Sequence, residues 1–315
     1  MSAPRAVAIG ECMLELARPR RAGCLGDGWR LGFGGDVFNT AYYLGRLGVP
    51  VAFLSALGAD PYSVEMRQAW ADAGLDVSLV LTDPRRMPGL YAIRTDESGE
   101  RSFSYWRSQS AARRMFELEG ADRALDQARN ADLLYFSGIT LSILEPSHRD
   151  ILLEVAHAVK ARGGSVAFDP NFRATGWPDR REAQRAMKQM APALSIVLPT
   201  LSDELLLWES DEAAASPEQW LEWGADELVL KDGASACRIW CGGESFSVPA
   251  RDVALVVDTT GAGDAFNAAY LAARVAGATC VAAAQAGHAL AGEVIGKPGA
   301  IVDAGAGLRY PGVIR

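Results

Sequence analysis

The sequence has few features of a disulfide-bonded, membrane-spanning or nucleic-acid-binding protein. Its five cysteines are odd in number and scattered, and its formal net charge is -8 over 315 residues. Phosphate backbones attract basic surfaces, so this charge argues against nucleic acid as the main partner. No uninterrupted apolar stretch approaches the ~18 residues that span a bilayer. The first residues lack a basic start followed by a long apolar run, so we expect neither a secretory leader nor a membrane partner.

The cysteines also give little support for a metal site. Cys237 and Cys241 form the close pair of the sequence, in "CRIWC". No second Cys or His pair stands at zinc spacing, so we favour reduced thiols and keep metal binding at this pair as the alternative. Reduced thiols are typical of cytosolic proteins, and we predict a cytoplasmic location.

Short apolar runs alternate with helical patterns along most of the chain. The runs that predict strands cover residues 6–10, 51–56, 133–137, 165–169, 195–198, 227–231 and 254–258. Apolar residues at helical spacing predict helices over 36–47, 62–73, 121–130 and 145–161. Strands that alternate with helices in this way indicate an α/β protein with a mainly parallel central sheet covered on both faces.

Two segments interrupt this alternation. Residues 89–107 contain "GLYAIRT", the turn "DESGE" and "RSFSYWR", which together predict a β-hairpin. With the β-like residues near the N-terminus, the hairpin predicts a small β lid formed by 12–33 and 85–110. The α/β core would then consist of 1–11, 34–84 and 111–315. An ordinary surface excursion is the alternative.

The stretch "DTTGAGDAF", residues 258–266, has the features of an anion-binding turn. A predicted strand precedes it and a predicted helix follows, and a helix N-terminus presents free backbone N–H groups to an anion. Gly261 and Gly263 lack a Cβ, so a phosphate can approach the main chain closely. The helix dipole favours an ionised Asp264, which could accept a proton from a hydroxyl beside the phosphate. The alternative is that Asp264 only stabilises the start of the helix.

The same stretch resembles the C-terminal signature of the ribokinase/PfkB family of carbohydrate kinases. The resemblance implies a ribokinase-like three-layer fold and a kinase that depends on ATP and Mg²⁺. It also implies that Asp264 is the general base and that Gly261, Ala262 and Gly263 supply amides to the transferred phosphoryl group. A requirement for a monovalent cation is left open, and pairing of subunits through the lid is implied by the family alone.

The segment "GFGGDVFNTAYYLGRLG", residues 32–48, resembles the N-terminal signature of that family. Asp36 and Asn39 are three apart and share one helix face, so together they can hold sugar hydroxyls. Gly34 and Gly35 would complete this sugar contact. Alternatively, Asp36 is only a helix cap and the glycines only form a turn.

The predicted lid carries the residues that indicate the kind of sugar. Tyr105 and Arg107 share a strand face in "SYWRSQSAA", and Tyr91 on the partner strand could join them. This stretch resembles 2-keto-3-deoxygluconate kinases, in which a lid tyrosine and arginine contact the acid sugar. The segment "FDPNFR" adds Arg173 as a second expected contact. A guanidinium meets a carboxylate with two parallel hydrogen bonds, although Arg107 could instead pair with a surface acid.

Three further segments resemble the nucleotide side of the family. In "LVLKDGASAC" the candidates for ATP binding are Lys231 and Gly233, and in residues 287–301 the candidate is His288, which could equally be an ordinary surface or core residue. Thr200, a further candidate for ATP binding, and Asp203 replace the Asn and Glu of the family's metal-organising segment. Because of that departure we expect no direct metal ligand, only contact through water from Asp203 and Glu204.

Together these features predict ATP-dependent phosphorylation of 2-keto-3-deoxy-D-gluconate at O6, giving 2-keto-3-deoxy-6-phosphogluconate. One alternative keeps the chemistry and changes the sugar to fructose, ribose or ketodeoxygalactonate, whose C4 configuration the sequence does not distinguish. Another is a non-catalytic sugar or nucleotide sensor on the same fold, although a sensor has no need for the aspartate of "GAGD".

Overall fold

The computed structural model describes residues 6–17, 28–95, 101–209 and 218–302. Its main sheet has the strand order β13-β12-β11-β10-β9-β8-β1-β4-β5. The strands are β1 (Ala6–Ile9), β4 (Val51–Gly58), β5 (Val80–Asp83), β8 (Leu133–Ser137), β9 (Ser165–Asp169), β10 (Ile196–Val197), β11 (Glu227–Leu230), β12 (Cys237–Cys241) and β13 (Glu244–Val248). Pairing is parallel from β5 to β11 and antiparallel from β11 to β13. The predicted mainly parallel sheet is confirmed.

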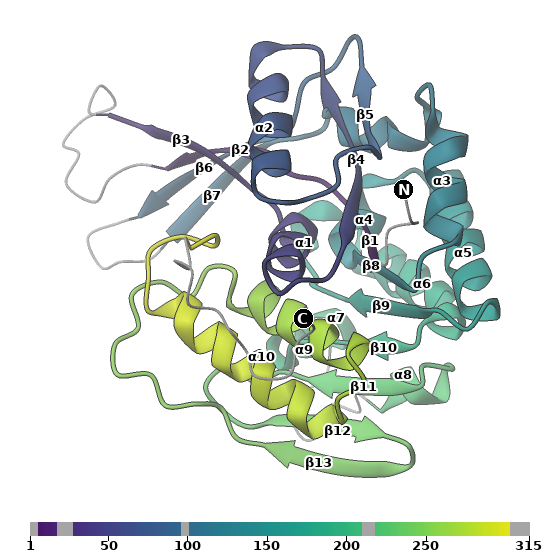
Figure 1. Ribbon diagram of the computed structural model, residues 1–315, viewed down its shortest axis with the longest axis vertical. Coiled ribbons are helices and arrows are strands. Elements are labelled where there is room, and N and C mark those ends of the chain that lie inside the picture. Colours follow the sequence, from purple (N-terminus) through teal and green to yellow (C-terminus); the bar gives the residue numbers. More distant parts are fainter. Residues whose placement is uncertain (1–5, 18–27, 96–100, 210–217, 303–315) are drawn as a thin grey trace.

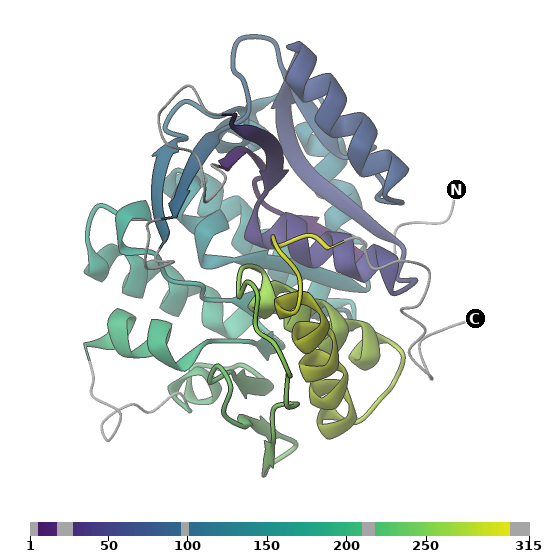
Figure 2. The same ribbon diagram turned by 90° about the vertical axis from the view of Figure 1, so that its left-hand side faces the viewer.

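Helices cover both faces of this sheet, giving the three layers visible in Figures 1 and 2. On one face lie α1 (Asp36–Arg46), α2 (Pro61–Asp72), α9 (Ala262–Val275) and α10 (Cys280–Ile295). On the other lie α3 (Ala121–Arg129), α4 (Gly138–Ile143), α5 (Pro146–Ala161), α6 (Arg180–Met190), α7 (Leu201–Trp208) and α8 (Gln219–Glu222). Among the described residues, no helix is long and apolar enough to cross a membrane.

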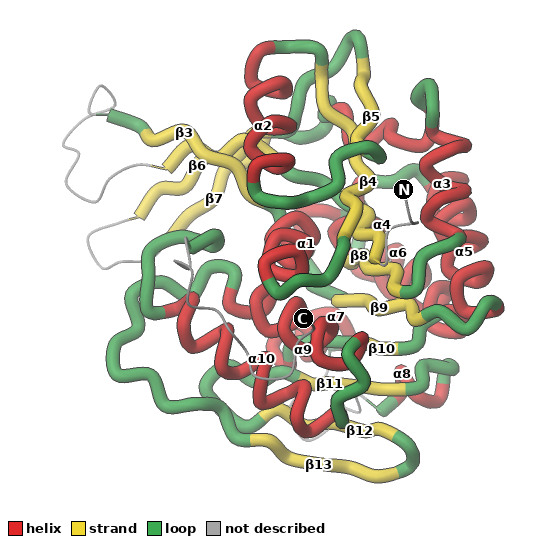
Figure 3. Tube along the Cα trace, in the orientation of Figure 1, coloured by secondary structure: helices red, strands yellow, loops and turns green. Residues whose placement is uncertain are grey.

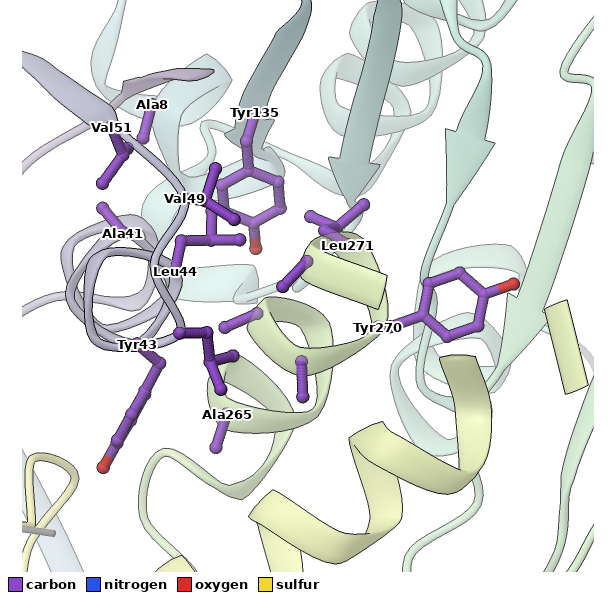
Figure 4. Close-up of a cluster of buried hydrophobic side chains, with 14 of the residues drawn as sticks. Ala8, Ala41, Tyr43, Leu44, Val49, Val51, Tyr135, Ala265, Tyr270 and Leu271 are labelled. Atoms are coloured by element: carbon purple, nitrogen blue, oxygen red, sulfur yellow. The ribbon is translucent and has the colours of Figure 1, made fainter. Parts of the chain in front are cut away.

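The contact between α1 and α9 brings the two predicted signatures together. Helix α1 buries one face, whereas α9 is buried on all sides over residues 265–273, and both contribute to one apolar cluster on the sheet. Figure 4 shows Leu44 of α1 and Leu271 of α9 on either side of the ring of Tyr135, which extends from β8. Small side chains along α9 allow the two helices to approach closely, so residues more than two hundred positions apart become neighbours.

A second sheet lies to one side of the three layers (Figure 1). Its strands are β2 (Met13–Ala17), β3 (Arg30–Gly34), β6 (Leu90–Thr95) and β7 (Arg101–Trp106), in the order β3-β2-β6-β7. The antiparallel pair β6–β7 places Tyr91 opposite Tyr105 and confirms the predicted hairpin; its turn lies outside the described residues. Strands from both predicted lid segments join in this sheet, because β2 pairs with β6.

Residues 254–258 do not form the predicted strand, and the chain there is irregular (Figure 3). The amides of Val257 and Asp258 donate to the carbonyl of Ile295 at the end of α10 instead of to a strand. Leu255 is 69% exposed, so this apolar run is not a buried strand. Apolar runs alone could not distinguish a sheet strand from a loop held by a helix end.

The sequence analysis also missed several elements, among them the hairpin β12–β13 and helix α4. The hairpin β12–β13 extends the sheet beyond its parallel part. Helix α4 begins directly where β8 ends, because Ser137 and Thr140 form a reciprocal capping box. The six residues of α4 are too few to be recognised against the longer helix α5 that follows.

Candidate active site

The candidate site lies at the carboxyl ends of the parallel strands. Asp169 is the last residue of β9, and Lys231 directly follows β11. Helices α1 and α9 begin at the same edge, with Asp36 and Asp264 in their first turns. Ligands of open α/β sheets bind at this edge, where loops and helix N-termini converge.

The glycine turn has the conformation that an anion-binding helix start needs. Gly261 is the N-cap of α9 with φ of 75°, and a Cβ there would lie 2.9 Å from the Cα of Ala300. A side chain is therefore excluded both by the left-handed backbone and by space. No side chain caps α9, and the first N–H groups of a helix have no partner within it. The turn can thus offer the amide of Gly263 to a phosphate, whereas the amide of Ala262 donates to the carbonyl of Thr259 at 3.2 Å in the ligand-free protein.

The carboxylate of Asp264, on α9, contacts α1. Nδ2 of Asn39 donates to its Oδ2 at 2.8 Å, and the hydroxyl of Thr40 donates to its main-chain carbonyl. Burial, and next the charge of Asp36, raise the pKa of Asp264 to about 8. The expectation of a permanently ionised carboxylate is therefore wrong for the ligand-free protein. A helix dipole is worth roughly 0.3–1 kcal/mol at a surface, which is too little to offset burial beside a second acid.

A buried polar network supports the turn from below, and the sequence analysis missed most of its members. Nζ of Lys231 donates to Asp169 at 2.8 Å and to Asn267 at 2.9 Å. Asn267 in turn donates to Asp169 and to the hydroxyl of Tyr135. A Cβ on Gly263 would lie 3.7 Å from the Lys231 ammonium, which places this charge directly under the glycine turn.

Asn267 follows Asp264 by three residues, which puts the two on one helix face and could have indicated it. The sequence analysis could also have identified Asp169 and Asn171, because both belong to the segment "FDPNFR" from which Arg173 was predicted. Nδ2 of Asn171 donates to Asp36 at 2.8 Å, and burial raises the pKa of Asp36. Asn171 thus orients the acid that was predicted from α1.

Gly34 and Gly35 bring the second sheet against the start of α1. A Cβ on Gly34 would lie 2.7 Å from the hydroxyl of Tyr91. A Cβ on Gly35 would lie 2.3 Å from the main-chain oxygen of Glu11. Any larger residue would push the sheet away from Asp36 and Asn39.

The three predicted lid residues lie together, and two of them bind acids, of which one is buried. The hydroxyl of Tyr91 donates to Glu15, and the ring of Tyr91 lies 6.1 Å from that of Tyr105, which is 46% exposed. The guanidinium of Arg107 donates to the carboxylate of Glu11, which is 3% exposed. Arg107 therefore pairs with an acid, as the alternative expected, but with a buried one at the base of the lid.

Arg173 and Asp203 were predicted for different ligands and instead contact each other. Nη1 of Arg173 donates to both oxygens of Asp203 at 3.0 Å. Burial raises the pKa of Asp203 while Arg173 opposes that shift. The structure contradicts the predicted contact of Glu204 with a metal-bound water. Glu204 is 2% exposed, and its Oε2 accepts hydrogen bonds from the indole N–H groups of Trp208 and Trp220. Burial raises the pKa of Glu204 to about 7.

The predicted nucleotide contacts are spread around the glycine turn. Thr200 is the N-cap of α7 and bridges to Lys231, and Gly233 follows in a left-handed conformation with φ of 55°. His288 is half-buried on α10, where its Nε2 lies 3.2 Å from the carbonyl of Val248 and its ring meets the edge of Phe266. Burial lowers the pKa of His288, so it is neutral at pH 7.

These residues suit a phosphorylated nucleotide better than a protein-held metal. The uncapped start of α9 and the Lys231 ammonium below it match the charge of a phosphate chain. Within the described ranges, no three His, Cys, Asp or Glu side chains come together as a metal site. Mg²⁺ usually keeps several waters and binds through substrate phosphates with one or two carboxylates. The described residues also give no support to a metal at Cys237 and Cys241.

Comparison with known proteins adds independent findings. The family model described as pfkB family carbohydrate kinase matches residues 3–305. The 2-dehydro-3-deoxygluconokinase of Escherichia coli (strain K12) is 40% identical over 301 residues, covering 93% of this chain and 96% of its own. The crystal structure of a PfkB protein from Polaromonas sp. JS666 superposes with a TM-score of 0.81 at 25% identity, covering 93% of this chain and 96% of that one. A putative ribokinase II from E. coli in complex with ATP and Mg²⁺ has the same fold, with a TM-score of 0.80 at 22% identity over 94% of each chain.

Proposed function

Since this chain belongs to the pfkB family of carbohydrate kinases, we propose that it phosphorylates 2-keto-3-deoxy-D-gluconate, also called 2-dehydro-3-deoxygluconate, at its O6 hydroxyl. The observation that carries the chemistry is the place of Asp264, which lies at the uncapped start of α9 and within hydrogen-bond distance of Asn39. The identity of 40% to the E. coli 2-dehydro-3-deoxygluconokinase supports the substrate. The product is 2-keto-3-deoxy-6-phosphogluconate.

In this proposal Asp264 accepts the proton of the sugar hydroxyl while the phosphoryl group is transferred. A base works best when its pKa is near the working pH, and the pKa of Asp264 is about 8. The amides of Gly261, Ala262 and Gly263 stabilise charge on the phosphoryl oxygens, and Lys231 adds positive charge beneath them. Asp36 and Asn39 orient the sugar from the neighbouring helix.

ATP and Mg²⁺ are the proposed co-substrate and metal. When bound, Mg²⁺ neutralises phosphate charge and helps to position the transferred group. Thr200, Gly233 and His288 lie on the elements around the glycine turn and are the proposed nucleotide contacts. Asp203 is the one acid that we retain for contact through metal-bound water.

The substrate is tested by offering the purified protein a panel of sugars and measuring ATP consumption. We expect turnover of the keto-deoxy sugar acid at a kcat/KM well above that of fructose or ribose, with the phosphate on O6 by phosphorus NMR. Preference for a neutral sugar would contradict the proposed substrate. Tight binding of the sugar acid without any turnover would favour a sensor over an enzyme.

We expect the Arg107→Ala variant to bind the sugar acid 10- to 100-fold more weakly. A hydrogen bond to a charged group is worth about 1.5–3 kcal/mol, which corresponds to one to two powers of ten in affinity. Calorimetric titration of the sugar acid in the presence of a non-hydrolysable ATP analogue measures the effect. A neutral sugar should lose far less affinity, and equal losses for both ligands would contradict the carboxylate contact.

The pH dependence of kcat/KM reports the protonation of Asp264. The carboxylate form is the active base, and burial keeps it protonated until the pH approaches about 8. With both substrates well below saturation, kcat/KM should therefore rise with pH and level off above about 8. Residual activity of Asp264→Asn should lack this rise, and an unchanged profile in that variant would assign the titration to another group.

Three finer features complete the proposal. Leu31 and Trp106, which are 46% and 61% exposed, lie on the face of the second sheet opposite Tyr91 and Tyr105. We propose that two copies of the chain pair through this face. Analytical ultracentrifugation would detect the dimer. A requirement for a monovalent cation would be tested by assays with K⁺ against a bulky organic cation. The described free cysteines fit a cytoplasmic location, which fractionation would check.

A further inference from the structure

Glu11 occupies the point where the second sheet leaves the core. It lies between the end of β1 and the start of β2, and its side chain is 1% exposed. Its main-chain oxygen is so close to Gly35 that a Cβ there would lie 2.3 Å away. Glu11 therefore contacts the lid base and the start of the helix that carries Asp36 and Asn39.

Its carboxylate binds the residue that the proposed function assigns to the substrate carboxylate. Oε2 of Glu11 accepts a hydrogen bond from Nη2 of Arg107, immediately after β7. The side chain of Arg107 is 20% exposed, so it is not fully enclosed by the protein. The pair links the core to the end of the lid hairpin across a sequence separation of 96 residues.

The pair is not saturated with hydrogen bonds. Among the described residues, Oε1 of Glu11 and Nε of Arg107 have no hydrogen-bond partner although both are buried. A guanidinium has five N–H donors, and a single hydrogen bond joins that of Arg107 to Glu11. Buried polar atoms without partners are unfavourable and rare in native proteins. The unpaired Nε donor of Arg107 therefore indicates a place for an additional acceptor, whereas the unpaired Oε1 of Glu11 needs a donor.

We infer that Glu11 is a positioning residue that holds Arg107 ready for the carboxylate of the sugar acid, an inference that rests on the proposed function. Glu11 keeps its bond during binding, because releasing Arg107 would leave a buried carboxylate without a counter-charge. The remaining donors of the guanidinium then meet the substrate carboxylate. Preference for an acid sugar thus depends on a pair of residues, of which only Arg107 touches the substrate.

Gly89 keeps this pair in place. A Cβ on Gly89 would lie 2.9 Å from Oε1 of Glu11 and 3.1 Å from Cβ of Arg107. The backbone of Gly89 does not have a positive φ, so alanine would act by displacing these two side chains and not by backbone strain. We expect Gly89→Ala to weaken sugar-acid binding in the same direction as loss of Glu11, without removing any charge.

The test is a double-mutant cycle of Glu11→Ala and Arg107→Ala, read by calorimetric binding of 2-keto-3-deoxygluconate and by kcat and KM. Glu11→Ala should weaken binding about tenfold in the wild-type background, as expected for loss of orientation at a charged hydrogen bond. It should have no further effect when Arg107 is already alanine. Glu11→Gln retains an oxygen acceptor and should recover most of the loss, and KM for ATP should stay unchanged throughout.

A merely structural role would give a different pattern. Equal losses from Glu11→Ala in both backgrounds would overturn the inference, as would unchanged sugar-acid binding by Arg107→Ala. Glu182→Ala, which breaks a surface pair with Arg149 and Arg185, is the control for lost ion pairs and should leave KM unchanged. Coupled binding without turnover would refute the proposed activity alone, whereas a wild-type protein that does not bind the sugar acid would refute both.

Discussion

Replacement of Asp264 by asparagine is expected to lower kcat by about 10²- to 10⁴-fold, the usual contribution of a general base. An amide cannot accept the proton of the sugar hydroxyl, whereas its oxygen can still accept the hydrogen bond that Asn39 now donates to Asp264. The fold and the affinity for sugar should therefore change little. Steady-state kinetics with 2-keto-3-deoxygluconate, together with calorimetric binding of the same sugar, measures both quantities.

A matched control separates catalysis from helix stabilisation. Asp122 is an exposed acid in the first turn of α3, far from the site in sequence, as Asp264 is an acid in the first turn of α9. If Asp264 acted only by a favourable interaction with the helix dipole, Asp122→Asn and Asp264→Asn would both lower kcat only slightly. Near-normal turnover of Asp264→Asn would refute the general-base assignment, whatever the affinity for sugar.

The sequence was informative wherever function depends on residues that are close along the chain. The glycines and the acid of residues 258–266 fall within one turn, so their spacing predicts an anion site at a helix start. Asp36 and Asn39 share a helix face for the same reason. Alternating apolar runs and helical patterns predicted the parallel sheet, because strands of such a sheet are buried on both faces.

Contacts between distant segments could not be predicted in this way. The bonds from Arg107 to Glu11 and from Lys231 to Asp169 join residues 96 and 62 positions apart. Only the packing of the strands sets their partners. The same limit explains the error about the charge of Asp264: its place at a helix start was readable, but its burial beside Asp36 was not.

Replacement of Lys231 by methionine is expected to lower the free energy of unfolding by about 3–5 kcal/mol, the usual effect of removing one partner of a buried ion pair. The side chains of Lys231 and Asp169 are only 9% and 7% exposed, so water cannot compensate the carboxylate that remains. Urea denaturation measures the change. Arg129→Met is the control, since its pair with Asp126 is at the surface and should contribute no more than about 1 kcal/mol.

A second substitution decides whether the unpaired charge is the cause. In Asp169→Asn/Lys231→Met the buried charge is gone, while Asn267 can still bond the amide that replaces the carboxylate. The double variant should therefore be more stable than Lys231→Met alone, although it has lost one residue more. If the double variant were instead less stable than Lys231→Met by the full cost of Asp169→Asn, the ammonium would stabilise the fold through its bond to Asn267 or its packing under Gly263. Neutralising Asp169 would then bring no recovery, and the network would owe its stability to hydrogen bonds and not to the ion pair.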